Sequence, residues 1–182
     1  SADLGLVGEK AAEERVASEV FAEDELVLIT PPGLLDQKVL EKNSSGRGIV
    51  DLASSLPYPL LLREEGSATR RLFEKALSKI GVQLSDFAGI IYMDSLEAIK
   101  QGVRCGLGIS LVSWLSAEDY FRAGLVSVYQ PAGLDLTRRL YLVRHCRRVP
   151  SPAADALYKF ILEYAAAMSK ISVGGEDQKI LL

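Results

Sequence analysis

Two apolar runs near the middle of the chain are each followed by a hydroxyl-bearing turn and then by a helical spacing of apolar residues. Residues 60–63 lead into the turn at residues 64–69 and a helical pattern at residues 70–80, and residues 89–93 lead into Asp94 and a second such pattern. A strand followed by a helix, and then repeated, predicts an α/β domain with a mostly parallel sheet. Ligands bind such sheets at the edge formed by the carboxyl ends of the strands.

The rest of the chain fits the same alternation of strands and helices. Further strands are expected at residues 3–8, 26–30, 109–113, 125–129 and 137–144. The polar stretches at residues 9–19 and 34–48 predict loops, and Pro152 opens a last helix with an apolar stripe, followed by a fraying tail. The first of these strands has the composition of a buried strand, which needs neighbouring strands on both sides.

The composition predicts a folded protein without the charge of a nucleic-acid-binding module. The 182 residues suffice for one domain or two small lobes, and 48% hydrophobic with 25% charged residues predicts a packed core. The net charge of −3 lacks the basic surface that phosphate backbones require, and the basic stretch at residues 144–148 is interpreted as a solvated strand end. Neither a membrane-spanning apolar run nor a secretory leader is recognised, so we expect no membrane partner and a cytoplasmic location.

The residue types that usually carry catalysis or bind metals are scarce. The chain has one histidine, His145, and two cysteines, Cys105 and Cys146, without a C-x-x-C spacing, so neither a metal site nor another cofactor is expected. We expect both cysteines to be buried free thiols, with a redox-sensing pair as the alternative. Without a G-x-S-x-G motif or a pair of carboxylates singled out by spacing, no catalytic residue is expected.

Polar residues at the two helix starts form the strongest candidate for a binding site. Ser67 and Thr69 precede or open the first helix, and Asp94 and Ser95 open the second. Backbone N–H groups in the first turn of a helix lack partners within the helix and favour anions. Simple capping of the helix by a side-chain oxygen requires the same residues, and both interpretations stay open.

A set of motifs in a fixed order resembles the effector-binding domain of LysR-type transcriptional regulators. The motifs are Asp-Leu-Gly-Leu-Val-Gly at residues 3–8, Glu-Asp-Glu-Leu-Val-Leu-Ile at 23–29, the proline at 57, Leu-Leu-Arg-Glu-Glu-Gly-Ser-Ala-Thr-Arg at 61–70, Ser-Leu-Glu-Ala-Ile-Lys-Gln-Gly-Val at 95–103, Gly-Leu-Gly-Ile-Ser at 106–110 and the proline at 152. No single motif is specific to this family, but their order and spacing are. The resemblance covers residues 3–166.

The resemblance implies the two-lobed fold of type 2 periplasmic binding proteins, in which two crossover strands join the lobes and a small effector lies between them. Residues 1–30 and 131–168 would form the first lobe with its crossover strands, residues 31–130 the second lobe, and residues 169–182 a tail. The front of the first lobe and the winged helix-turn-helix of the family have no counterpart in this sequence. An incomplete first lobe is therefore expected.

The effector site of the family maps onto two loops of the second lobe and one of the first. The residues that we expect to bind the ligand are Arg63, Glu65, Ser67, Thr69, Asp94, Ser95, Val7 and Gly8. Their hydroxyls and helix-start N–H groups suit a small anionic metabolite, and none is expected to be catalytic. The resemblance further implies self-association into a dimer or tetramer, and DNA binding only through the helix-turn-helix that this sequence lacks.

Two other functions share this architecture. A solute-binding protein of a transporter would carry a signal sequence in its gene, whereas a regulator would carry a helix-turn-helix upstream. An enzyme on the same scaffold, such as a small dehydratase or deaminase, is disfavoured because the chain has no cluster of histidines or metal ligands. We therefore predict the effector-sensing domain of a LysR-type regulator.

Overall fold

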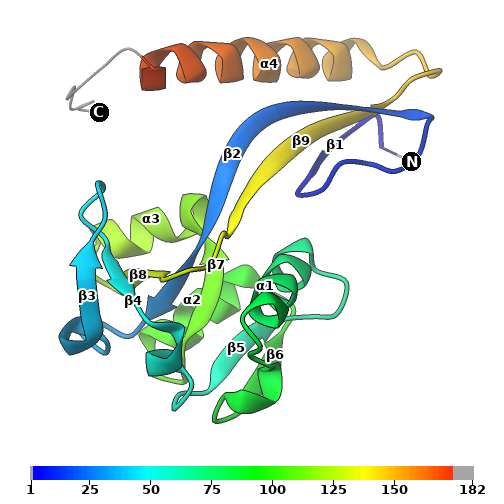
Figure 1. Cartoon of the computed structure of the whole chain (residues 1–182). Helices are drawn as coiled ribbons and strands as arrows, with labels where there is room; N and C mark the ends of the chain where they lie inside the picture. The colour runs from blue at the N-terminus through cyan, green and yellow to red at the C-terminus, as the bar shows by residue number, and fades with distance from the viewer. Residues whose placement is uncertain (1, 174–182) are drawn as a thin grey trace. The chain divides into compact units, whose positions relative to one another are not determined.

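The chain folds into two compact α/β units, shown in Figure 1. The computed structural model describes residues 2–173; residues 24–137 form one unit, and residues 2–23 with residues 138–173 lie in the other. We call these the central unit and the terminal unit. The predicted correspondence between the units and the two lobes of the family stays a prediction.

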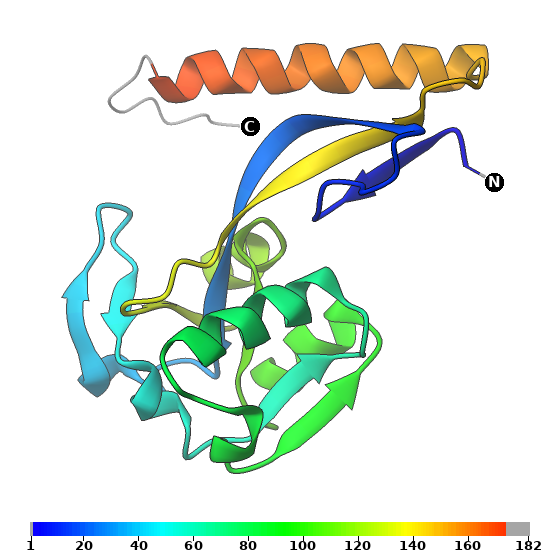
Figure 2. The same cartoon turned by 45° about the vertical axis from the view of Figure 1, so that its right-hand side comes forward.

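Three strands of the central unit point in the same direction and each runs into a helix. Strand β5 (Leu60–Arg63) pairs in parallel with β6 (Ile90–Met93), and a parallel bridge between Leu60 and Ile109 aligns the start of β7 (Ser110–Ser113) with β5. The helices that follow, visible in Figure 2, are α1 (Ala68–Lys79), α2 (Leu96–Arg104) and α3 (Trp114–Arg122). The starts of these helices therefore follow the carboxyl ends of neighbouring strands.

Residues 24–30 of strand β2 (Val16–Thr30) lie in the middle of the central unit. The strand pairs antiparallel with β7 and with β8 (Ser127–Pro131). Its residues Leu26 and Leu28 pack into one buried apolar cluster, and Val27 and Ile29 pack into a second. Because both faces of the strand are covered, its apolar run is continuous instead of alternating with polar residues.

A hairpin, β3 (Val39–Lys42) and β4 (Gly48–Val50), occupies the stretch that the sequence predicted to be a loop. The Asn43 side chain fixes the hairpin turn, because its Oδ1 accepts hydrogen bonds from the N–H groups of Ser45 at 3.0 Å and Arg47 at 2.9 Å. Short 3-10 helices precede β3 at Asp36–Lys38, follow β4 at Leu52–Ser55 and follow α1 at Leu84–Asp86. The loop prediction was wrong here because the strands have only four and three residues, too few to show a periodicity.

The sheets are mixed, as predicted, but antiparallel pairings prevail among the described strands. Strand β2 is antiparallel to β7 and β8, as is β3 to β4, whereas β5 and β6 are parallel and so are β4 and β8. A strand–helix–strand pattern identifies parallel neighbours along the chain. It cannot show that a strand from the distant start of the chain inserts between β7 and β8 in the opposite direction.

The terminal unit is a small sheet covered by one long helix. Strand β1 (Leu4–Val7) pairs antiparallel with β9 (Thr137–His145), which lies beside β2. Helix α4 (Pro152–Val173) packs on this sheet through the buried Tyr158, whose hydroxyl donates a hydrogen bond to Glu19 and whose ring centroid lies 4.1 Å from the Arg144 guanidinium. A single aromatic side chain thus links the helix to two strands.

The terminal unit departs from the sequence predictions in its strands and its helix. Strand β1 is not buried, since it pairs with β9 on one side and Leu6 is 61% exposed. Strand β2 already begins at Val16, inside the predicted loop. Helix α4 extends to Val173, past the predicted start of the tail, and residues 174–182 of that tail lie outside the described residues.

Both cysteines are exposed, so the prediction of buried thiols was wrong. Cys105 caps the end of α2 and Cys146 follows the last residue of β9, so each thiol lies at the end of an element and away from the core faces. Within residues 2–173, no helix is long and apolar enough to cross a membrane. The same part of the chain contains no group of three or more His, Cys, Asp or Glu side chains that could hold a metal ion.

Candidate functional site

The loops that follow β5 and β6 carry most of the predicted site residues. The parallel register sets Arg63 beside Met93 at the ends of the two strands, so both loops leave the sheet at the same edge. The predicted residues in these loops are Arg63, Glu65, Ser67, Thr69, Asp94 and Ser95. The fold of the central unit therefore brings the two predicted segments together, as expected for the carboxyl edge of parallel strands.

Arg63 is already paired with a neighbour that the sequence analysis did not single out. Its Nε and Nη2 atoms donate hydrogen bonds to the two carboxylate oxygens of Glu64, at 2.7 and 2.6 Å. These bonds lower the pKa of Glu64 to about 2 and raise that of Arg63, to which the charge of Asp94 also contributes. Arg63 thus links the two loops electrostatically, but much of its charge is neutralised by Glu64.

The loop before α1 leaves the start of that helix without a side-chain cap. Gly66 adopts a φ of 90°, a conformation that favours glycine, and the N–H of Ser67 donates to the carbonyl of Glu64 at 3.3 Å. Ser67 is the N-cap residue of α1, yet its hydroxyl makes no capping hydrogen bond. The first turn of α1 contains no acidic residue either. The backbone N–H groups of the first turn of α1 and the Ser67 hydroxyl are therefore the part of the edge best suited to an anion.

The start of α2 is capped, in contrast to that of α1. The Ser95 hydroxyl accepts a hydrogen bond from the N–H of Ala98 at 3.3 Å, and Glu97 places a carboxylate in the first turn. Of the two interpretations that the sequence left open, capping therefore holds for Ser95. It does not hold for Ser67.

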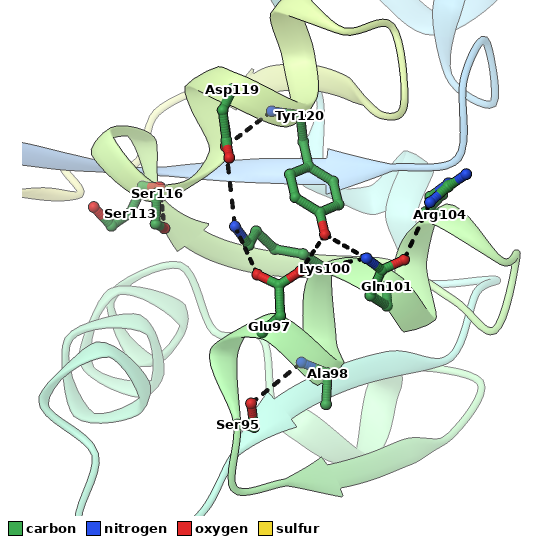
Figure 3. A network of polar contacts seen from close by, with 10 residues as sticks. All are labelled: Ser95, Glu97, Ala98, Lys100, Gln101, Arg104, Ser113, Ser116, Asp119 and Tyr120. Carbon is green, nitrogen blue, oxygen red and sulfur yellow. Dashed lines mark hydrogen bonds and ion pairs between the residues drawn. The ribbon is translucent and has the colours of Figure 1, made fainter.

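A polar network, drawn in Figure 3, fixes the first turn of α2 against α3. The Lys100 side chain is buried, and its Nζ lies 3.0 Å from Oε2 of Glu97, 3.9 Å from Oδ1 of Asp119 and 4.3 Å from the Tyr120 ring centroid. The Tyr120 hydroxyl donates to Glu97 and accepts from Gln101 Nε2 at 2.6 Å. The hydrogen bond with Tyr120 lowers the pKa of Glu97 and raises that of the phenol.

This network was not found from the sequence. The spacing of Glu97 and Lys100 on one helix does indicate an ion pair. Nothing in the local pattern indicates that Tyr120, on another helix, completes it. The network holds α2, whose N-cap residue is Ser95, in place against α3.

The start of α3 adds polar groups that the sequence analysis also missed. Ser113 Oγ donates to Oδ1 of the buried Asp24 at 2.8 Å. The Arg47 guanidinium lies 4.8 Å from the Trp114 ring centroid, and its Nη2 donates to Oε2 of Glu25 at 2.7 Å. The Nε and Nη1 atoms of Arg47 are buried and have no hydrogen-bond partner among the described residues. Arg47 lies in the stretch interpreted as a polar loop, which gave no signal for it.

The two predicted residues of the first lobe lie in the terminal unit. Val7 is the last residue of β1, where it pairs with Tyr141, and Gly8 follows it in a bend. Their contribution to the ligand site stays a prediction. Between residues 63 and 70 and at residues 94–96, the loops of the central unit carry hydroxyl, carboxylate and guanidinium groups.

An α/β protein with polar helix starts at the carboxyl ends of parallel strands has the architecture of a small-molecule binding domain. The family of LysR substrate binding domains matches residues 1–166. The chain belongs to this family, and the predicted resemblance is confirmed.

Curated relatives place the same segment in longer proteins. The chain is 33% identical over 168 residues to the RuBisCO operon transcriptional regulator of Allochromatium vinosum, covering 92% of this chain and 52% of that protein. It is 34% identical over 154 residues to the phosphonates import ATP-binding protein PhnC of Anaeromyxobacter dehalogenans, covering 85% of this chain and 29% of that protein. The chain thus spans about half the length of the regulator and less of the transport protein.

Solved structures confirm the predicted type 2 periplasmic-binding-protein-like fold. The regulatory domain of Synechocystis CcmR in complex with 2-PG has a TM-score of 0.71 at 20% identity, covering 91% of this chain and 74% of that chain. The effector binding domain of QuiR in complex with shikimate has a TM-score of 0.69 at 21% identity, covering 91% and 72%.

Proposed function

We propose that this chain senses a small molecule for a LysR-type transcriptional regulator, and that the ligand binds at the edge formed by the loops after β5 and β6. The observation that carries the proposal is the start of α1, where the Ser67 hydroxyl makes no capping bond and the first turn holds no acid. Ligand binding would change how the full regulator assembles and thereby change transcription. The family membership of residues 1–166 supports this function.

The ligand of this site is a small anion. Helix-start N–H groups and hydroxyls stabilise a negative charge, and one similar domain was solved with shikimate, a carboxylate. Glu64 and Asp94 carry negative charge beside Arg63, so the charge of Arg63 is not what attracts the ligand. Recognition therefore depends on directed hydrogen bonds from Ser67 and the first turn of α1.

Self-association and DNA binding belong to the full regulator in this proposal. The resemblance suggests a partner surface on β6 and α1, where Tyr92 is 59% and Ile80 is 43% exposed. DNA would be bound by a helix-turn-helix segment outside this sequence, and the protein would work in the cytoplasm. A solute-binding protein of a transporter is less well supported, because the relatives of which this chain covers half or more are regulators.

A thermal-shift screen with a matched pair of variants tests the site. Small carboxylates, amino acids and aromatic acids are added to the wild-type chain and to Ser67→Ala and Ser78→Ala. Ser78 lies at the other end of α1, where its hydroxyl donates to the Lys75 carbonyl at 2.8 Å. We expect one chemical class to raise the melting temperature of wild type and Ser78→Ala, but not of Ser67→Ala.

Two results would contradict the proposal. Equal stabilisation of all three proteins would mean that the ligand binds elsewhere. Turnover of a compound, abolished by a change in these loops, would show an enzyme and not a sensor.

A further inference from the structure

Helix α4, orange in Figure 1, has an apolar side that the described part of the chain leaves exposed. Tyr158 faces the sheet and is 6% exposed, whereas Leu157 is 51%, Phe160 63% and Tyr164 59% exposed. The Phe160 and Tyr164 rings stack on each other, with their centroids 6.2 Å apart and their planes inclined at 22°. Single exposed apolar side chains are ordinary on protein surfaces, but a contiguous row of them marks an interaction surface.

The spacing of the exposed apolar residues is that of a helix that packs against another helix. The residues are separated alternately by four and three positions, and we call them the α4 stripe: Ala153, Leu157, Phe160, Tyr164 and Ala167. An apolar residue at every about 3.5 positions is the repeat of a coiled-coil seam. Small residues lie at both ends of the stripe and large residues at its centre. The stripe therefore has the same order of sizes when it is followed in either direction.

The charged residues beside the stripe favour a partner helix that runs in the opposite direction. Lys159 and Glu163 lie on the same flank of the stripe, and both are exposed. If a second copy of α4 runs antiparallel, Lys159 lies level with Glu163 of the second copy, whereas in a parallel pair like charges lie level. Lys159 Nζ also lies 2.7 Å from Oδ2 of Asp155 in its own helix, so these charges select the direction of pairing more than they strengthen it.

We propose that α4 pairs antiparallel with α4 of a second copy of this chain, through the α4 stripe. A twofold axis beside Phe160 sets Leu157 level with Tyr164 of the second copy, and an alanine level with an alanine at each end. A membrane surface is a poorer partner, because one cation and one anion flank the stripe and anionic lipids attract an excess of cations. This surface is separate from the one suggested on β6 and α1, and the proposed sensing function does not require it.

Sedimentation equilibrium tests the pairing with a matched pair of variants. Leu157→Glu places a charge in the α4 stripe, and Leu115→Glu makes the same change at a leucine of α3 with similar exposure, 56% against 51%. At chain concentrations from about 1 to 300 µM, the range of weak protein–protein contacts, we expect wild type and Leu115→Glu to form dimers. Leu157→Glu should raise the dissociation constant at least about tenfold.

Two results of the sedimentation experiment would overturn the proposal. A wild-type chain that stays monomeric over this range would leave the stripe to a different partner. A dimer that Leu157→Glu and Leu115→Glu weaken equally, or that neither weakens, would mean that the contact lies elsewhere on the chain.

Disulfide cross-linking tests the direction of pairing and does not depend on how well Leu157→Glu folds. In a background of Cys105→Ser and Cys146→Ser, the variants Ala153→Cys and Ala167→Cys each place one thiol at an end of the stripe. With oxidised glutathione as the oxidant, an antiparallel pair forms the disulfide when the two variants are mixed, whereas a parallel pair forms it in each variant alone. Cross-linking of each variant alone, or none in the mixture, would contradict the proposal. Neither measurement needs an effector, so failure of the proposed sensor site would leave both unchanged.

Discussion

At the scale of single residues, one glycine sets how closely β7 can approach β5. A Cβ atom built on Gly108 would lie 2.2 Å from the Pro59 carbonyl oxygen and 2.8 Å from a methyl carbon of Leu61. The first obstacle is backbone and the second belongs to the fully buried Leu61 side chain, so neither can easily move aside. We expect Gly108→Ala to lower the free energy of unfolding by ~3 kcal/mol, measured by urea denaturation.

The matched control for this substitution is Gly89→Ala. Nothing lies within 4 Å of a Cβ at Gly89, which flanks β6. Its cost should stay within ~0.5 kcal/mol. Similar losses for both variants would show that close approach is not the reason for glycine at position 108.

The Glu64 carboxylate predicts a pH dependence at the same scale. Its pKa falls from 4.5 to about 2 in the folded state through the bonds from Arg63. A lowered folded pKa contributes stability that is present above the unfolded value and is lost as the pH falls toward the folded value. Relative to Glu64→Gln, the wild-type chain should therefore lose its advantage between pH 4.5 and about 2.

Urea unfolding of both proteins across that range measures the difference. Arg63→Gln should remove most of this pH dependence, because it deletes the largest cause of the lowered pKa of Glu64 and leaves only the hydrogen bond to its backbone. A difference between wild type and Glu64→Gln that does not change with pH would refute the pair as its source.

At the scale of elements, the two helix starts at the candidate site differ in a way that stability measurements can detect. The Ser95 hydroxyl caps α2, so Ser95→Ala should cost ~1 kcal/mol of unfolding free energy. The Ser67 hydroxyl makes no capping bond in α1, so Ser67→Ala should cost close to nothing. Thermal or urea denaturation of the two variants checks this.

An equal cost for both variants would show that Ser67 also caps its helix. The start of α1 would then lose the feature that favours an anion there. If the costs differ as expected, Ser67→Ala is the better variant for binding studies, since any lost affinity cannot be attributed to a weakened helix.

At the scale of the whole molecule, the buried core is distributed unevenly between the units. Among the described residues, nearly all buried apolar side chains belong to residues 24–137, whereas the terminal unit contributes Leu142 and Tyr158. Amide hydrogen exchange should therefore be fast in β1 and α4, through local opening, and slow in β5 and β7. Mass spectrometry of exchanged peptides measures this, and equal protection of the two units would contradict it.

The local parts of the fold and site could be predicted from the sequence. The runs at β5 and β6, the polar turns after them and the apolar spacing of α1 and α2 each depend on neighbours within a few residues. The pattern also points to Ser67, Thr69, Asp94 and Ser95 as polar residues at helix starts, whereas Arg63, Glu65 and the family came from the resemblance of the ordered motifs. That these residues bind a ligand stays a prediction. The hairpin at Asn43 was missed because short strands carry weak periodicity, and the exposure of Cys105 was missed because it lies at the end of α2, where the helical pattern does not fix which side is buried.

By itself, then, the sequence determined the strand–helix repeats of β5 to α2 and the two polar loops, because periodicity and turn chemistry are local properties, and the order of its motifs determined the family. Only the tertiary structure decided that β2 lies between β7 and β8, that Tyr120 joins Glu97 and Lys100, and that Asp3 meets the chain at Ser151. These contacts join residues far apart in the chain. They depend on how buried surfaces pack, which no local pattern specifies.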